Sequence, residues 1–164
     1  MTEFEALLRL HMTRGIGTKT YQALIERFGS SEAILNAPRA ELEAVPGIGP
    51  KLATAVIETS RNIDIASEIN LAKEKNVQII PHTSDQYPKH LKAIYDPPLV
   101  LYVKGNILET DVIALAIVGA RRCTYYGLSQ AERFSRLLAQ KGFCIVSGMA
   151  RGIDAAAHRG AINS

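Results

Sequence analysis

The sequence has few of the residues that mark certain classes of protein. Its 164 residues include no tryptophan, two cysteines and 6% aromatic residues. Cys123 and Cys144 lack CxxC spacing and metal-ligand histidines, so we expect packed thiols, without a disulfide framework or a metal site. No apolar run reaches the roughly 18 residues that span a bilayer, and the acidic N-terminus is unlike a secretory signal. We therefore expect a cytoplasmic protein without membrane contact.

The net charge of +3 is small but unevenly distributed along the chain. Residues 1–75 hold 9 Lys and Arg against 10 Asp and Glu, whereas residues 76–164 hold 10 against 6. The second segment is the better candidate for a polyanionic partner such as nucleic acid. An ordinary solvated surface is the alternative that composition alone leaves open.

Two similar helical hairpins are expected in the first 75 residues. Helical periodicity flanks the loop sequence RGIG, and the same pattern recurs around PGIG, 32 residues later. The second copy resembles the helix-hairpin-helix family at Pro46, Gly47, Ile48, Gly49 and Lys51. In that family the glycines allow a tight turn, and amides at the start of the second helix meet a DNA phosphate. Gly47, Gly49 and Lys51 are therefore expected to form a secondary DNA contact, with a pure packing role as the alternative.

Lys51 also stands where helix-hairpin-helix DNA glycosylases with lyase activity carry their Schiff-base lysine. Those enzymes need a catalytic aspartate downstream in a setting like V-D-T-H. Asp64 lies in the sequence RNIDIAS, which does not match that pattern. We therefore expect no glycosylase chemistry.

The rest of the chain is predicted to contain strands. Four prolines between residues 81 and 98 indicate a loop, in which His82 and His90 have no partner at metal-ligand spacing. Apolar segments predict strands at 99–103, 112–118 and 143–147, with a helix between the last two. A strand, helix and strand in succession form a parallel crossover, so we expect the last two strands to be parallel. We expect the strand at 99–103 to join the same parallel sheet.

The predicted fold class is therefore α/β. Residues 1–75 form a helical domain with two helix-hairpin-helix (SAM-like) motifs. Residues 76–164 form the first part of a Rossmann-like domain, whose parallel sheet is truncated at Ser164.

The main site is expected where the strands at 112–118 and 143–147 end. The loops GARR and SGMARGID follow these strands and meet at one edge of the sheet, where open α/β sheets bind ligands. Each loop leads into a helix N-terminus, and both carry arginine, a combination suited to phosphate. The predicted phosphate-binding residues are Gly119, Arg121, Arg122, Ser147, Gly148, Arg151, Gly152 and Asp154. Among them, Asp154 is expected to cap the last helix or to orient an arginine, because a carboxylate repels phosphate.

The glycine spacing argues against a dinucleotide cofactor. Ala, Arg, Arg and Cys follow Gly119, so the G-x-G-x-x-G pattern of NAD and FAD enzymes is absent. We expect no cofactor.

The segments AIVGARRCTYYG and IVSGMARGIDAAAHRGAI resemble two motifs of the DNA-processing protein A (DprA/Smf) family. With the hairpin domain and the Tyr-Pro and Asp-Pro-Pro segments, the resemblance covers nearly the whole chain. It implies a protein without enzymatic activity that binds and protects single-stranded DNA, helps to load the RecA recombinase in natural transformation or recombination, and forms a homodimer when full length. Arg121 matches the pocket arginine of the family, and Gly119, Ser147, Gly148, Gly152 and Asp154 match its pocket walls. Tyr125 and Tyr126 either stack on bases or pack against the protein.

The resemblance also implies strands beyond Ser164 that supply a pocket lysine and much of the dimer surface. We therefore expect the chain alone to self-associate or to have low stability, and to bind single-stranded DNA weakly. Two other functions remain open. One is a nucleotide phosphoribohydrolase of the lysine-decarboxylase-like Rossmann family, whose PGGxGTxxE-type motif does not occur in these residues. The other is an interaction scaffold that acts through the hairpins.

Overall fold

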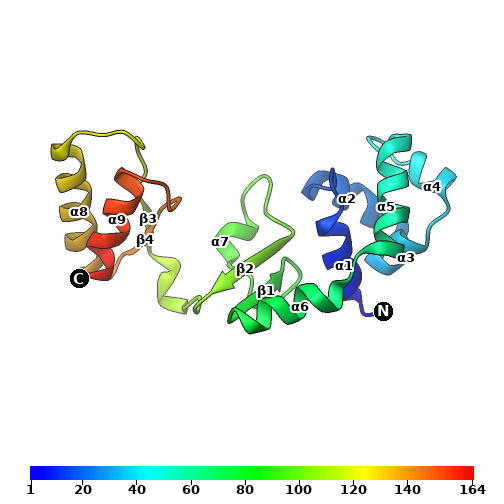
Figure 1. Ribbon diagram of the computed structural model, residues 1–164, viewed down its shortest axis with the longest axis horizontal. Helices are drawn as coiled ribbons and strands as arrows, with labels where there is room; N and C mark the ends of the chain where they lie inside the picture. The colour runs from blue at the N-terminus through cyan, green and yellow to red at the C-terminus, as the bar shows by residue number, and fades with distance from the viewer. The chain divides into compact units, whose positions relative to one another are not determined.

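The computed structural model describes the backbone of residues 1–164 and every side chain except those of residues 60 and 61 (Figure 1). The chain forms two compact units, residues 1–106 and residues 107–164. The boundary expected between residues 75 and 76 stays a prediction. It lies inside the first unit, because the strands that follow it pair with each other and pack on the helices.

Six helices open the first unit. They are α1 (Glu3–Met12), α2 (Thr18–Phe28), α3 (Ser31–Asn36), α4 (Arg39–Glu43), α5 (Pro50–Asn62) and α6 (Ile65–Glu74). Three of these helices begin with a side-chain cap, in which a side-chain oxygen accepts a hydrogen bond from an otherwise free amide. Thr2 and Glu5 form a reciprocal capping box at α1, Ser30 caps α3, and Asp64 caps α6.

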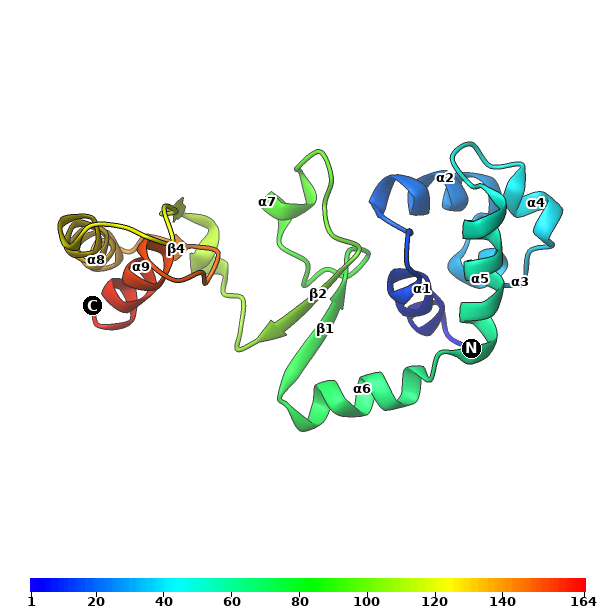
Figure 2. The same cartoon turned by 45° about the horizontal axis from the view of Figure 1, so that its top comes forward.

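The core of this unit lies between its helices. Leu7 and Leu8 of α1, Leu24 of α2 and Val56 of α5 are among its fully buried side chains. Burial of one such side chain contributes about 1.5 to 3 kcal/mol. Figures 1 and 2 show α1, α2, α3 and α5 gathered around this core.

The two hairpins have equivalent backbones, which confirms the internal repeat. Gly15 and Gly47 have φ of 98° and 87°, a region that strongly favours glycine. The amides of Ile16 and Ile48 each donate a hydrogen bond to the carbonyl three residues earlier, and both isoleucine side chains are buried. Other buried positions also repeat at the 32-residue offset: Leu10 and Leu42, Thr13 and Val45, Tyr21 and Ala53, Leu24 and Val56.

A strand pair completes the first unit. β1 (Val77–Pro81) and β2 (Val100–Lys104) are antiparallel, with Ile79 opposite Tyr102, and the short helix α7 (Lys89–Lys92) lies between them in the chain. The prediction that the strand at 99–103 joins the parallel sheet is therefore wrong. The intervening loop folds back on itself, because the hydroxyl of Tyr87 donates to the carbonyl of Pro98 at 2.8 Å, and so brings β2 beside β1.

The second unit contains a parallel crossover. Its elements are the 3-10 helix η1 (Glu109–Val112), β3 (Ala114–Ala116), α8 (Tyr125–Ala139), β4 (Cys144–Val146) and α9 (Ile153–Ile162). β3 and β4 are parallel, with Leu115 opposite Ile145, which confirms the predicted pairing. Both strands are shorter than predicted, although hydrogen bonds at Ile113 and Ile117 extend the pairing by one residue at each end.

The helices α8 and α9 pack side by side in this unit, as both views show. The contact is close because Gly160 of α9 faces the backbone of α8, where a Cβ atom would lie 2.2 Å from the carbonyl oxygen of Glu132. The buried apolar side chains here are small: Ala131, Ala156 and Ala157. Across the described part of the chain, no helix combines the length and apolar character needed to cross a membrane.

Candidate functional site

The loops that follow β3 and β4 lie side by side, as the parallel pairing requires. The hydroxyl of Ser147 donates to the carbonyl of Ile117 at 2.7 Å. The amide of Ile153 donates to the carbonyl of Ala120 at 3.3 Å. Each loop therefore restrains the other, and the predicted meeting of the two motifs at one sheet edge is observed.

Asp154 joins the two loops through its carboxylate. One oxygen accepts from the amide of Gly119 at 3.2 Å, and the other accepts from the amide of Gly148 at 3.1 Å. Burial opposes ionisation, but hydrogen bonds from the amides of Gly119, Ala150 and Gly148 hold the pKa of Asp154 below its ordinary value. Asp154 thus neither caps α9 nor pairs with an arginine among the described residues, in contrast to both expected roles.

The three glycines of the predicted site are placed by contacts within the protein. A Cβ atom at Gly119 would lie 2.8 Å from the side chain of Ile153, and one at Gly148 would lie 2.9 Å from the carboxylate of Asp154. Gly152 has a φ of 86°, and a Cβ atom there would lie 2.3 Å from the carbonyl oxygen of Ala120. These glycines are needed to bring the loops together, which is a different role from direct approach to an anion.

Arginines gather in an open depression of about 830 Å³ beside the two loops. We call it the strand-end depression. It is lined by Arg121, Arg122, Cys123, Thr124, Leu128, Gly152 and Arg159. The structure thus brings Arg121, Arg122 and Gly152 together, whereas Arg151 is exposed outside the lining.

Arg159 was not predicted from the sequence. It reaches the depression because α9 crosses α8 closely at the neighbouring Gly160. The sequence HRGAI gives no sign of that crossing, since the contact depends on the packing of two helices. The sequence feature that could have indicated this position is an arginine next to a glycine in a predicted helix, and that feature is weak evidence.

The positive charge of the depression comes from side chains more than from free amides. The N-terminal amide of Gly127 in α8 is already bonded to the side chain of Thr124, and Asp154 places a negative charge in the first turn of α9. None of the lining residues is a carboxylate. Within the described residues, no cluster of His, Cys, Asp or Glu is arranged to hold a metal ion. The arrangement is suited to binding an anion.

Tyr125 and Tyr126 lie at the start of α8 and are largely exposed. The sequence left open whether these tyrosines stack on bases or pack against the protein, and the structure does not show packing within this unit. Their rings are accessible for stacking.

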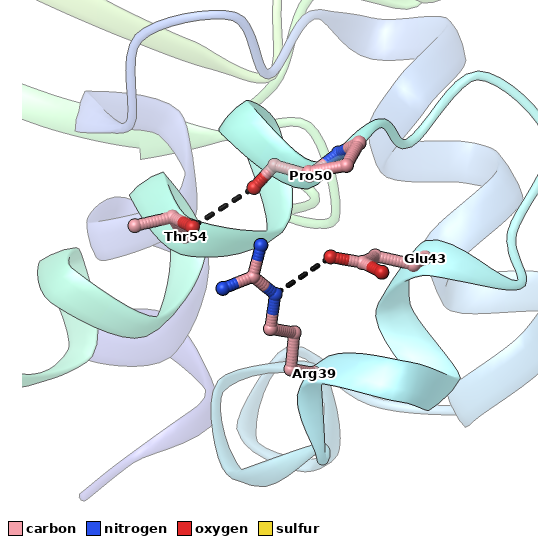
Figure 3. A network of polar contacts seen from close by, with 4 residues as sticks. All are labelled: Arg39, Glu43, Pro50 and Thr54. Atoms are coloured by element: carbon pink, nitrogen blue, oxygen red, sulfur yellow. Dashed lines mark hydrogen bonds and ion pairs between the residues drawn. The ribbon is translucent and has the colours of Figure 1, made fainter.

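The predicted secondary site, at Gly47, Gly49 and Lys51, lies at the exposed N-terminus of α5. Figure 3 shows its surroundings: Nε of Arg39 pairs with Glu43 at 2.6 Å, and the hydroxyl of Thr54 donates to the carbonyl of Pro50 at 2.9 Å.

The first hairpin differs from the second at the same positions. Thr18 is buried and donates to the carbonyl of Pro97 at 2.6 Å. The ammonium of Lys19 lies 4.5 Å from the ring centre of Tyr95. At the start of α2, Thr18 and Lys19 thus contact the loop before β2, although Gly17 and Lys19 are exposed, as Gly49 and Lys51 are at the start of α5.

Comparisons with known proteins match two families, one on each side of residues 63–77. Residues 4–62 match the SAM-like helix-hairpin-helix tandem family, and residues 78–164 match the DNA recombination-mediator protein A family. The DNA processing protein DprA of Bacillus subtilis (strain 168) is 41% identical over 93 residues, which are 56% of this chain and 31% of that protein. Protein Smf of Synechocystis sp. is 32% identical over 149 residues, covering 88% of this chain and 37% of that protein.

A solved structure has the same fold. The X-ray structure of DNA processing protein A (DprA) from Streptococcus pneumoniae superimposes with a TM-score of 0.66 and 26% identity, over 99% of this chain and 54% of that chain. The chain spans about a third of the length of the two curated relatives. Since the family match covers more than half of its residues, the chain belongs to the DNA recombination-mediator protein A family.

Proposed function

We propose that the chain binds single-stranded DNA through phosphate contacts in the strand-end depression. The observation that carries this proposal is the grouping of Arg121, Arg122 and Arg159 around one open depression without a carboxylate in its lining. An arginine can donate two hydrogen bonds to phosphate oxygens, and an open depression admits a chain that continues on both sides. Family membership and the DNA-processing names of the relatives support DNA as the polyanion.

The biological role that we propose is DNA processing in natural transformation or recombination. It includes protection of single-stranded DNA, loading of RecA and homodimerisation of the full-length protein in the cytoplasm. We propose that binding involves no catalysis. The arginine lining supports this, because it offers no carboxylate or histidine for general acid–base chemistry on a nucleotide.

A secondary phosphate contact is proposed at the second hairpin. The exposed start of α5 and the side chain of Lys51 support it, since the equivalent Lys19 of the first hairpin is held against Tyr95. A helix N-terminus attracts phosphate through its free amides. Because this contact has one cationic side chain, Lys51, whereas the strand-end depression has three arginines, we expect it to add less to affinity.

The test is a fluorescence-anisotropy titration of the chain with an oligothymidine and with a duplex of the same length. The Arg121→Ala variant should bind the oligothymidine more weakly by about 1 to 3 kcal/mol, the range for losing a charge-assisted hydrogen bond. Higher salt should weaken binding by the wild-type chain, because phosphate contacts release counterions. The Lys51→Gln variant also removes one positive charge and should have a smaller effect. Unchanged affinity in a folded Arg121→Ala variant would remove Arg121 from the site.

A further inference from the structure

A second depression continues from the strand-end depression along α8. We call it the α8 groove, and its volume is about 430 Å³. The two depressions share Leu128 and Arg159, so they form one continuous surface. The α8 groove adds Tyr125, near the end of the first strand motif, and also Arg133 and Arg136, which lie outside both motifs.

The groove side chains of α8 form a stripe along one face of the helix. Tyr125, Ser129, Arg133 and Arg136 are spaced by four, four and three residues. At about 100° per residue these positions fall within one side of the helix. From Tyr125 to Arg136 the stripe is about 16 Å long, at about 1.5 Å per residue. A stacked nucleic-acid strand rises about 3.4 Å per nucleotide, so the stripe matches about five nucleotides.

The charge of the groove is mostly unpaired. Arg159 pairs with Glu132 at 3.6 Å, and both side chains are about half exposed. Arg133 and Arg136 are exposed and form no ion pair with any described residue. An exposed pair such as Arg159 and Glu132 contributes little to stability, so a phosphate group can replace the carboxylate at Arg159.

Gly160 gives this arrangement a fixed geometry. Its contact with the backbone of Glu132 holds α9 against α8, and the adjacent Arg159 is therefore held at the point where the two depressions meet. A positive residue at this junction can contact a phosphate that passes from one depression to the other.

We propose that the α8 groove is a second phosphate-binding segment for the same strand of nucleic acid, which runs from Arg121 past Arg159 to Arg133 and Arg136. This inference rests on the proposed function of the strand-end depression and adds the path of the strand. Glu132 is the one acidic residue along that path. It acts as an internal competitor that occupies Arg159 until a phosphate arrives.

The experiment compares oligothymidines of about 4 and about 20 nucleotides, because the groove matches about five. Affinities are measured by fluorescence anisotropy at several salt concentrations. For the longer oligothymidine, the Arg133→Gln/Arg136→Gln variant should lose at least about fivefold in affinity. The slope of the logarithm of its affinity against the logarithm of the salt concentration should become shallower by about 1.4, since each single-strand phosphate contact contributes about 0.7. The shorter oligothymidine should bind with nearly unchanged affinity. The matched control, Arg27→Gln/Lys75→Gln, removes the same charge from the first unit and should leave both affinities unchanged.

The Glu132→Gln variant gives a test of opposite sign. It should bind the longer oligothymidine about twofold to threefold more tightly at low salt, because it frees Arg159 and removes a like charge from the path. One outcome would contradict the second phosphate-binding segment and leave the proposed function standing. In that outcome, the Arg133→Gln/Arg136→Gln variant binds the longer oligothymidine with unchanged affinity, whereas Arg121→Ala binds it more weakly. No effect of Arg121→Ala on either length would overturn both.

Discussion

The two units of the chain are held together by different means. Among the described residues, the first unit buries leucine, isoleucine and valine side chains from six helices, α1 to α6, and from the strand pair. The second unit buries mainly alanine side chains, together with Ser135 and the carboxylate of Asp154. Its large apolar side chains on the sheet, such as Leu115 of β3 and Val146 of β4, are exposed. The first unit therefore depends on a hydrophobic core, whereas the second depends on backbone contacts and hydrogen bonds.

This difference bears on function, because the contacts that hold the second unit also shape its site. Asp154 bonds to both loops, and Gly152 packs on the loop that carries Arg121. Arg121 and Arg122 thus extend from a loop that is already restrained before any ligand binds. Restraint of this kind lowers the entropy cost of binding. The described residues of the first unit show no such arrangement at the second hairpin, where Lys51 lies in the first turn of α5.

The largest expected effect is the loss of a core side chain from the first unit. Leu24→Ala should lower the free energy of unfolding of that unit by about 2 to 5 kcal/mol, because it leaves a cavity among fully buried neighbours. In the second unit, Leu115→Ala should cost less than about 1 kcal/mol, since Leu115 is 40% exposed. Hydrogen exchange followed residue by residue would measure both units. Equal losses would show that the second unit also depends on apolar burial.

The sequence predicted best those features that depend on neighbours along the chain. The hairpin repeat followed from glycine spacing, and the parallel pairing of β3 and β4 followed from the strand, helix and strand order. The pairing of β1 with β2 was not predicted, because the sequence of an apolar strand does not indicate which strand it pairs with. Recognising Arg159 would have required the crossing of α8 and α9, which Gly160 permits.

The role of Asp154 could not be predicted for a related reason. Its acceptor contacts join Gly119, 35 residues away in the chain, to Gly148, six residues away. The sequence places Asp154 near the start of a helix, where a capping role is the usual expectation. In the structure, the carboxylate instead accepts hydrogen bonds from two amides of neighbouring loops.

The next effect concerns the helix crossing. Gly160→Ala should destabilise the second unit by about 1 to 3 kcal/mol, because the added methyl group would meet the backbone of Glu132 and push the helices apart. The second hairpin of the first unit provides a control: a Cβ atom at Gly49 would have no neighbour within 4 Å, so Gly49→Ala should cost no more than the roughly 0.5 to 1 kcal/mol of placing alanine at a helix N-cap. Exchange protection in α8 and α9 measures the difference. Full protection in the Gly160→Ala variant would mean that the crossing adapts to a larger residue.

The smallest effect, and the most specific to the site, is the acid sensitivity of the second unit. The folded-state pKa of Asp154 lies below its unfolded value of about 3.9, because ionised Asp154 accepts hydrogen bonds from the amides of both loops. Its contribution to stability is therefore complete above about pH 4 and is lost as the pH falls through the folded pKa. We expect the second unit to lose stability on acidification below about pH 4, measured as the urea midpoint of its unfolding at each pH.

The Asp154→Asn variant tests whether this carboxylate is the cause. Its amide has one oxygen acceptor where the carboxylate has two, so one of the Gly119 and Gly148 amides loses its partner and the variant should be less stable at neutral pH. Its urea midpoint should also depend less on pH below about 4, since the group that titrates has been removed. Asp85→Asn removes an exposed carboxylate from the first unit and should leave the pH dependence of the second unit unchanged. If the Asp154→Asn variant kept the acid sensitivity of the wild-type chain, other carboxylates would be responsible, and the loops that position Arg121 would be held together by their glycine and backbone contacts alone.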